Sequence, residues 1–370
     1  MKIAIIGTKG WSYAGHEDLI REMGWRFVED GHKFVIHAWA QKKNNTYYFK
    51  DDVIQNGVKR VFHKTSDGKF LGQLIVAFKS SLKAAFSDCD LIYYAFIQNG
   101  IYSWIPRLLG KKIVCNVNGI MWKDPKWPII FRHIFFPLGA YLTYFISHKT
   151  ITDSLHMQEL YKKKFKMTID WIGYGCDDIV PGKKEIDLVN LHPNGYYLIM
   201  SRITPHNLTD IMIEGYLKSG SKKDLVIAGH IPNNLWFRSI KKKCENKSIS
   251  FLGLISDQDY LTQIILNSCA YLHGHSLGGI NPALVRVTGL DKPVICIDTI
   301  FNREVVEYPN RKLQAIVFIK NYISVANAIQ KYENNEVYFT NEAKNLGSKI
   351  RATMSWGKIY QKYLMLFKSM

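Results

Sequence analysis

The fold is decided by the segment Tyr271-Leu-His-Gly-His-Ser-Leu-Gly-Gly-Ile-Asn-Pro-Ala-Leu-Val285. The apolar residues 270–272 predict the end of a buried strand. A Gly278-Gly279 turn follows, and Asn281 and Pro282 suit the cap and first position of a helix. The backbone N–H groups and the helix dipole of such a unit face whatever lies over the turn. We therefore expect an anion site in an α/β domain, with an ordinary βα loop as the alternative.

Polar side chains gather in this turn. His273, His275 and Ser276 stand between the expected strand and the expected helix. The two histidines are metal-ligand types, but no carboxylate or cysteine partner accompanies them. Hydrogen bonding to a phosphate or a sugar therefore suits them better than metal binding, and we expect no metal.

Short apolar strands alternate with helices on both sides of this segment, which predicts doubly wound parallel sheets. We expect an N-terminal domain at 1–175, a second domain at 176–350 and a last helix at 351–370. In such sheets, ligands bind at the carboxyl ends of the strands. The expected strands are 2–6, 33–40, 91–96, 112–117, 150–152, 196–201, 225–229, 250–252, 270–272 and 294–297.

The composition limits the class of protein. With 370 residues, 47% hydrophobic residues and 13% aromatic residues, the chain is globular rather than disordered. Its six cysteines form no Cys-x-x-Cys pair, which argues against a disulfide framework and indicates a reducing compartment. A formal charge of +18 favours polyanionic partners such as phosphorylated ligands, anionic lipid or nucleic acid. Nucleic acid is the weaker alternative, because no recognition helix or basic-aromatic platform is evident.

Two segments bear on the membrane. The strand Ile3–Ile6 follows Met1-Lys2 at once and leaves no room for a secretory apolar region, so we expect a cytoplasmic protein. The longest charge-free apolar run, Ile134–Ser147, is too short to span a bilayer. It either lies in a membrane interface or forms a buried helix lining an interdomain cleft.

Loops after other strands supply further candidates. The loop Gly7-Thr-Lys-Gly10 departs from G-x-G-x-x-G, and the second strand ends without an acidic residue, which argues against a dinucleotide dehydrogenase. Its backbone either holds a phosphate or sugar or makes a plain tight turn. Glu17 is a candidate general base, or else a first-turn charge on a helix dipole. Arg202 is a candidate for binding a diphosphate, or else a solvated loop arginine.

With these residues in view, the chain resembles the GT-B glycosyltransferases. It is most similar to the rhamnosyltransferase-like branch of the family-4 type, which takes part in capsule, O-antigen and exopolysaccharide assembly in bacteria. The similarity covers nearly the whole chain. It is carried by Ile3–Gly10, Gly119 with Trp122-Lys123, Tyr174-Gly175, Arg202-Ile-x-Pro205, His273–Pro282, Phe301–Glu304 and Ser355-Trp356.

The resemblance implies two Rossmann-like domains facing across a cleft, a nucleoside-diphosphate sugar as donor, and neither metal nor cofactor. It implies catalytic roles for Glu17, Asn118 and Arg202, and acceptor contacts at His16, Gly119 and Trp122. It implies that the donor is bound by Gly7, Thr8, Lys9, Gly10, Arg202, Asn207, His273, His275, Ser276, Gly278, Gly279, Ile280, Asn281, Ala283 and Arg286.

Three positions depart from the family pattern. Arg286 replaces a glutamate that grips the donor ribose, Asn118 replaces an acidic residue, and Met121 replaces another glutamate. Two functions therefore stay open. One is a glycosyltransferase that moves rhamnose or another hexose to a lipid-linked saccharide, associated peripherally with the anionic inner-membrane surface. The other is a catalytically degenerate GT-B subunit that supports a partner glycosyltransferase. A homo-oligomer is compatible with both.

Overall fold

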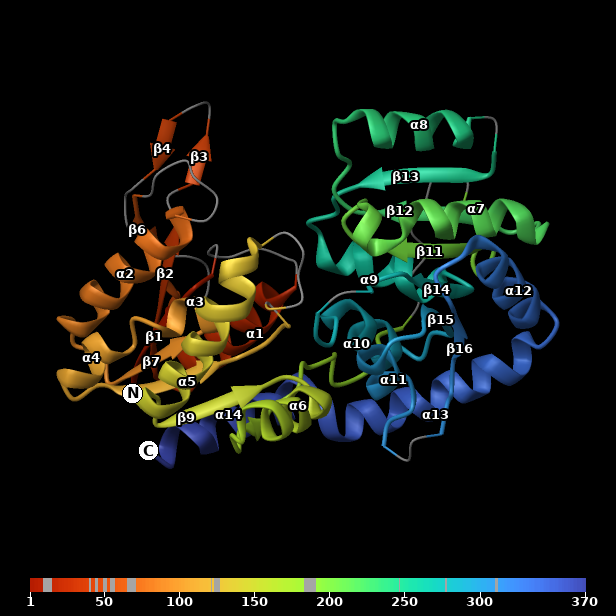
Figure 1. The fold of residues 1–370 in the computed structure, drawn as a ribbon. Helices are drawn as coiled ribbons and strands as arrows, with labels where there is room; N and C mark the ends of the chain where they lie inside the picture. Colours follow the sequence, from red (N-terminus) through yellow and green to blue (C-terminus); the bar gives the residue numbers. More distant parts are fainter. Residues whose placement is uncertain are drawn as a thin grey trace. The chain divides into compact units, whose positions relative to one another are not determined.

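The computed structural model describes residues 1–8, 15–39, 41–43, 46–48, 52–53, 57–64, 71–120, 122, 127–182, 191–245, 247–276, 278–309 and 312–370. The chain divides into two compact units (Figure 1). Unit 1 comprises Met1–Tyr174 together with Gly357–Met370, and unit 2 comprises Gly175–Trp356.

Unit 1 is built on a sheet that, in the described residues, has eight strands in the order β10-β9-β8-β7-β1-β2-β6-β5. Neighbouring strands are parallel except β5, which pairs antiparallel with β6. The central strands β1 and β7 are apolar apart from Lys2 at the start of β1, as burial on both faces requires. The bounds are β1 Lys2–Ile6, β2 Lys33–Trp39, β5 Asp52–Val53, β6 Lys59–His63, β7 Leu91–Tyr94, β8 Lys112–Asn116, β9 Lys149–Thr152 and β10 Asp170–Trp171; β3 Gln41–Lys43 and β4 Thr46–Tyr48 form a separate antiparallel pair.

Helices cover this sheet on both faces (Figure 1). On one face, α1 (His16–Glu29) packs against α14 (Trp356–Lys368), where Phe27 contacts the rings of Tyr360 and Phe367. On the other lie α2 (Leu71–Ala85), α3 (Ile97–Gly100), α4 (Trp104–Leu108) and α5 (Phe136–Ile146), the last preceded by the π-helix η3 (Phe131–Phe135); α6 (Leu155–Phe165) connects β9 to β10.

Unit 2 has a sheet in which all six strands of the described residues are parallel, in the order β13-β12-β11-β14-β15-β16. Tyr197 and Ile199 of β11 face a core formed with α7, α8 and α12. On the opposite face, Tyr196 donates a hydrogen bond to the Ile264 carbonyl of α9. The bounds are β11 Tyr196–Met200, η4 Pro205–Asn207, α7 Thr209–Ser219, β12 Asp224–Ala228, α8 Leu235–Cys244, β13 Ile249–Gly253, α9 Gln258–Asn267, β14 Ala270–His273, α10 Pro282–Gly289, β15 Val294–Ile297, α11 Ile300–Val306, β16 Ile316–Phe318, α12 Tyr322–Glu333 and α13 Glu336–Met354.

The expected doubly wound parallel sheets are confirmed, and every expected strand is present. The sequence prediction missed β6, β10 and β16, the antiparallel β5 at the sheet edge, and the separate β3–β4 pair. Near the C-terminus the helix breaks at Ser355, where the backbone pairs with Cys176. Among the described residues, no helix is both long and apolar enough to cross a bilayer.

Candidate functional site

Two loops of unit 2 lie side by side at the carboxyl edge of its sheet, because β11 and β14 are neighbouring parallel strands. The loop after β11 carries Arg202 and Asn207, and the loop after β14 carries His275 and Ser276. This edge is where parallel α/β sheets bind ligands. The topology therefore brings together residues that are about 70 positions apart in the sequence.

Asn207 joins the two loops. Its buried side chain donates from Nδ2 to the carbonyl of Arg202 at 2.7 Å, so its Oδ1 is the atom that accepts from His275 Nδ1 at 3.0 Å. The Ser276 hydroxyl adds a bond to the His206 carbonyl at 2.9 Å. These bonds fix the backbone that carries Arg202 against the turn that carries His275.

The same bonds define the chemistry of the His275 ring. Since an amide oxygen only accepts, Nδ1 carries the proton and Nε2 keeps its lone pair. Burial, and next the positive charge of Arg202, lower the pKa of His275 to about 4, so the ring is neutral at physiological pH. Nε2 lies 3.8 Å from the position that a Cβ at Gly278 would occupy, so it is directed toward the glycine turn. Nε2 can therefore accept a hydrogen bond from a hydroxyl group.

The glycine turn leads into α10. Gly278 has a φ of +100°, a backbone conformation that favours glycine. Asn281 caps the helix by accepting from the Ala283 N–H at 2.9 Å, while Ile280 is buried beside it. The helix begins where the sequence predicts. The Ala283 N–H is already hydrogen-bonded to the cap residue Asn281. Gly279 stands between the turn and this cap, exposed in part.

His273 lies deeper than its neighbour. Only 2% of its surface is exposed, and Nδ1 lies 3.0 Å from the Tyr271 hydroxyl, which also donates to the Met200 carbonyl. Burial, followed by the proximity of His275, lowers the pKa of His273 to about 3. In this structure His273 supports the end of the strand from within the core.

Arg286 points from α10 to α9. Its guanidinium donates to Gln258 Oε1 at 2.7 Å, to Thr262 Oγ1 at 2.8 Å and to the Gln258 carbonyl at 3.3 Å. All three acceptors are neutral. The contacts therefore fix the orientation of the guanidinium, but they do not neutralise its positive charge. Neither Gln258 nor Thr262 was predicted from the sequence as a partner of Arg286.

In unit 1, candidate residues gather at the carboxyl edge of the sheet. His16 begins α1, its Nδ1 lies 3.2 Å from the Tyr174 hydroxyl, and burial lowers its pKa to about 4. Glu17 follows in the first turn. Asn118 is buried after β8, and its Oδ1 accepts from the Asp153 N–H at 2.8 Å and from the Thr152 hydroxyl at 3.3 Å.

Two residues beside this group were not predicted from the sequence. The pKa of Tyr174 is raised by burial and then by the Asp153 carboxylate, to which its hydroxyl is hydrogen-bonded. Tyr174 and Asp153 therefore extend the polar group around His16 and Asn118. A signal was present for Asp153, because it follows a buried strand, as Asn118 does.

Other expected site residues of unit 1 have structural surroundings of their own. Gly7 has a φ of +102°, and a Cβ there would come within 2.1 Å of Asn99 Nδ2, so this position needs glycine. Thr8 is buried, and Gly119 has a φ of +83°. Trp122 is buried against Tyr161 and Phe165. Lys9, Gly10 and Met121 lie outside the described residues.

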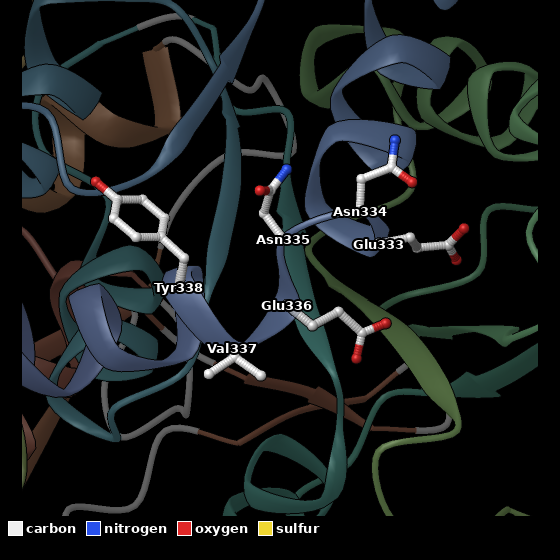
Figure 2. Close-up of a pocket in the computed structure, with 6 residues that line it drawn as sticks. All are labelled: Glu333, Asn334, Asn335, Glu336, Val337 and Tyr338. Atoms are coloured by element: carbon white, nitrogen blue, oxygen red, sulfur yellow. The ribbon is translucent and has the colours of Figure 1, made fainter.

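A pocket elsewhere on unit 2 does not coincide with these residues. Figure 2 shows it lined by the six consecutive residues 333–338 at the α12–α13 junction. Glu333 accepts there from Tyr197, near the start of β11, so the pocket lies at the amino-terminal edge of the sheet. Because parallel sheets bind ligands at the opposite edge, we place the candidate site at Arg202 and His275. Among the described residues, no three His, Cys, Asp or Glu side chains are grouped as metal ligands.

No protein-family model and no curated protein sequence matches the chain. Solved structures do match. Sucrose-phosphate synthase from Thermosynechococcus elongatus is 14% identical, with a TM-score of 0.79 over 100% of this chain and 98% of that one. Anabaena HepE, solved with UDP and glucose, is 16% identical, with a TM-score of 0.75 over the whole of both chains. The α,α-trehalose 6-phosphate synthase of Burkholderia multivorans is 10% identical, with a TM-score of 0.71 over 100% of this chain and 96% of that one.

These structures are GT-B glycosyltransferases, and the expected GT-B fold of two Rossmann-like domains is confirmed. At such identities the likeness establishes the fold. It leaves the chemistry to be argued from this chain's own residues.

Proposed function

We propose that this chain, on its GT-B fold, is a glycosyltransferase that moves rhamnose or another hexose from a nucleoside-diphosphate sugar to a lipid-linked saccharide. The observation that supports the proposal is the pair of hydrogen bonds made by the Asn207 side chain. They hold Arg202 and His275 together at one edge of the sheet in unit 2. The structural neighbour HepE was solved with UDP and with UDP-glucose, which supports a donor of this class.

The donor site belongs to unit 2 in this proposal. Arg202 is exposed and cationic, so its guanidinium is free to approach the diphosphate and stabilise negative charge as that group leaves. His275 accepts a hydroxyl of the sugar through Nε2. The glycine turn at 278–279 allows the backbone of the protein to approach the donor closely.

Acceptor binding belongs to unit 1 in this proposal. Glu17 orients or deprotonates the acceptor hydroxyl, and His16 and Asn118 bind the saccharide around it. His16 is neutral because burial lowers its pKa, so it is suited to hydrogen bonding rather than to ion pairing. The acceptor is a lipid-linked glycan at the cytoplasmic face of the inner membrane, where the charge of +18 favours an anionic surface.

A second candidate rests on Arg286 and Asn118. The guanidinium of Arg286 can accept no hydrogen bond from a ribose, and it is engaged with Gln258 and Thr262. Asn118 cannot act as a base. These features favour the catalytically degenerate subunit, which supports a partner glycosyltransferase without turnover of its own.

Turnover distinguishes the two candidates. Purified protein is incubated with radiolabelled nucleoside-diphosphate sugars and membrane lipid extract, and labelled lipid is counted. We expect transfer by the wild type and a loss of about 100-fold in Arg202→Ala, the usual cost of removing one group that stabilises developing charge. Unchanged turnover in Arg202→Ala would refute the role of this residue. Binding of a nucleoside diphosphate without any transfer would favour the degenerate subunit.

A further inference from the structure

A helical segment of unit 1 turns its apolar side chains outward. In η3 and α5, which together span residues 131–146, Ile134, Leu138 and Phe145 are 60%, 55% and 76% exposed. They recur at helical spacing along one side, as do Ile130 and Leu142. The buried positions of α5 are on the other side: Phe136, Gly139, Ala140 and Thr143. A soluble helix normally shows the opposite arrangement, with polar residues outward.

The first turns of this segment are less buried than the helix that follows. None of the five residues of η3 is buried, and Ile129 and Ile130 before it are exposed. Ile134 of the π-helix is 60% exposed, whereas Phe131 and Phe135 are half-buried and their rings contact each other. Within unit 1, the run Ile134–Ser147 is therefore buried on one side of α5 and exposed on the other.

A neighbouring element enlarges the surface. In α4, Trp104 and Leu108 are exposed, the latter at 77%. The end of α4 is fixed beside the end of α5 by Arg107, whose Nη1 lies 2.8 Å from Nδ1 of His148. We call the combined surface the apolar face; it comprises Trp104, Leu108, Ile130, Ile134, Leu138, Leu142 and Phe145.

The sequence that forms the apolar face and its surroundings is predominantly basic. Between Leu91 and Thr152 the sequence has seven Lys and Arg residues and a single carboxylate, Asp124. Arg107 and Lys112 are exposed, and Arg132 lies within η3. A surface with apolar side chains and surrounding cations matches an anionic lipid interface, where apolar groups enter the headgroup region and cations meet lipid phosphates.

Shape favours lipid over a folded protein partner. Exposed fractions above three quarters at Leu108 and Phe145 mean that these side chains protrude rather than line a groove. A lipid interface accommodates protruding side chains individually, whereas a protein partner must supply a complementary groove. Large exposed apolar surfaces are uncommon on proteins that stay in water.

We propose that the apolar face is the surface by which unit 1 binds an anionic membrane, with the side chains of η3, α4 and α5 inserted at the headgroup level. The proposal deepens the membrane setting of the proposed function, but it needs no catalysis. A lipid-linked acceptor reaches unit 1 from the same lipid surface.

Vesicle sedimentation with the full-length protein tests it. The vesicles are phosphatidylcholine mixed with phosphatidylglycerol, compared with phosphatidylcholine alone. The test variant is the triple substitution Ile134→Ser, Leu138→Ser and Phe145→Ser. The matched control is Leu235→Ser, Leu254→Ser and Val337→Ser, three comparably exposed apolar residues of unit 2. Thermal shift with UDP monitors folding and the donor site in every variant.

We expect the wild type and the control to sediment with the phosphatidylglycerol vesicles, and to do so less at high salt. The test variant should bind these vesicles at least about tenfold more weakly. Equal binding by the test variant and the wild type would overturn the proposal, as would no binding by the wild type. Loss of self-association in the test variant, without any vesicle binding, would assign the face to a second copy of the chain instead. UDP binding is independent of these outcomes, so the failure of the donor site is recognised separately.

Discussion

Among single residues, several side chains of the candidate site hold other residues in place. Asn207 is the clearest example. Its amide nitrogen donates to the Arg202 carbonyl in its own loop, and its amide oxygen accepts from His275 in the other loop. The buried His273 plays a similar part beneath His275. Both histidines are neutral because burial opposes the charged form.

These neutral histidines predict a dependence of stability on pH. The pKa of His273 is about 3 in the folded protein against an ordinary value of 6.5, so below pH 6.5 the unfolded chain takes up a proton that the folded chain does not. The free energy of unfolding is therefore highest above pH 6.5 and falls as the pH drops toward 3. Because His16 and His275 behave alike, His273→Gln should reduce the slope without abolishing it.

Urea denaturation of the wild type and His273→Gln at neutral pH and near pH ~5 measures this slope. The two proteins should differ most at neutral pH and converge in acid. A constant difference at all pH values would show that His273 is not buried in its neutral form.

At the scale of elements, the candidate site depends on the close approach of the two loops in unit 2. Gly274 marks the contact, since a Cβ at this position would lie 2.2 Å from the carbonyl oxygen of Asn207. A backbone atom cannot move aside as a flexible side chain does. The loops meet this closely because position 274 has no side chain.

Gly274→Ala should therefore push the two loops apart. We expect a loss of about 1–3 kcal/mol in the free energy of unfolding, as for other overpacked positions, together with weaker binding of nucleoside diphosphates. Gly182→Ala is the control, because a Cβ at that position meets nothing within 4 Å. Denaturant titration and calorimetry would measure the two effects, and equal stability of both variants would contradict the close approach.

The sequence predicted the elements better than it predicted the contacts of the site. Periodicity and glycine turns located β1, β11, β14 and the start of α10, because these features are local. The bond from Asn207 to His275 joins residues 68 positions apart, and the partners of Arg286 lie on another helix. Such pairs depend on strand order, which local patterns do not contain. Strand β6 was missed because Lys59–His63 contains only two adjacent apolar residues, Val61 and Phe62, and lacks the apolar run of a central strand. Strand β5 was missed because it is only two residues long.

At the scale of the whole molecule, the last helix belongs to the first unit. Ile359 and Tyr363 of α14 are buried in unit 1, and Phe367 stacks on Phe27 of α1. Unit 1 is therefore completed only when the C-terminal segment has been made. This arrangement ties the folding of unit 1 to residues that follow unit 2 in the chain.

Phe367→Ala should destabilise unit 1 by about 3–5 kcal/mol, because a buried aromatic ring is replaced by a cavity. Met365→Ala serves as the control, since Met365 is exposed on the same helix. Limited proteolysis with mass spectrometry would locate the loss. Early cuts within 1–174 are expected in Phe367→Ala alone, and equal resistance of the two variants would show that α14 is not part of this core.

In the proposed function, a nucleoside diphosphate binds to unit 2 through Arg202. Isothermal titration calorimetry of UDP, GDP and dTDP with the wild type, Arg202→Ala and Arg238→Ala measures this binding. Arg238→Ala is the control, because Arg238 is an exposed arginine of the same unit whose guanidinium donates to Asn233. We expect at least one of these nucleotides to bind the wild type and Arg238→Ala equally, and to bind Arg202→Ala about 10- to 100-fold more weakly. Equal affinity in all three proteins, or no binding by any of them, would contradict the account.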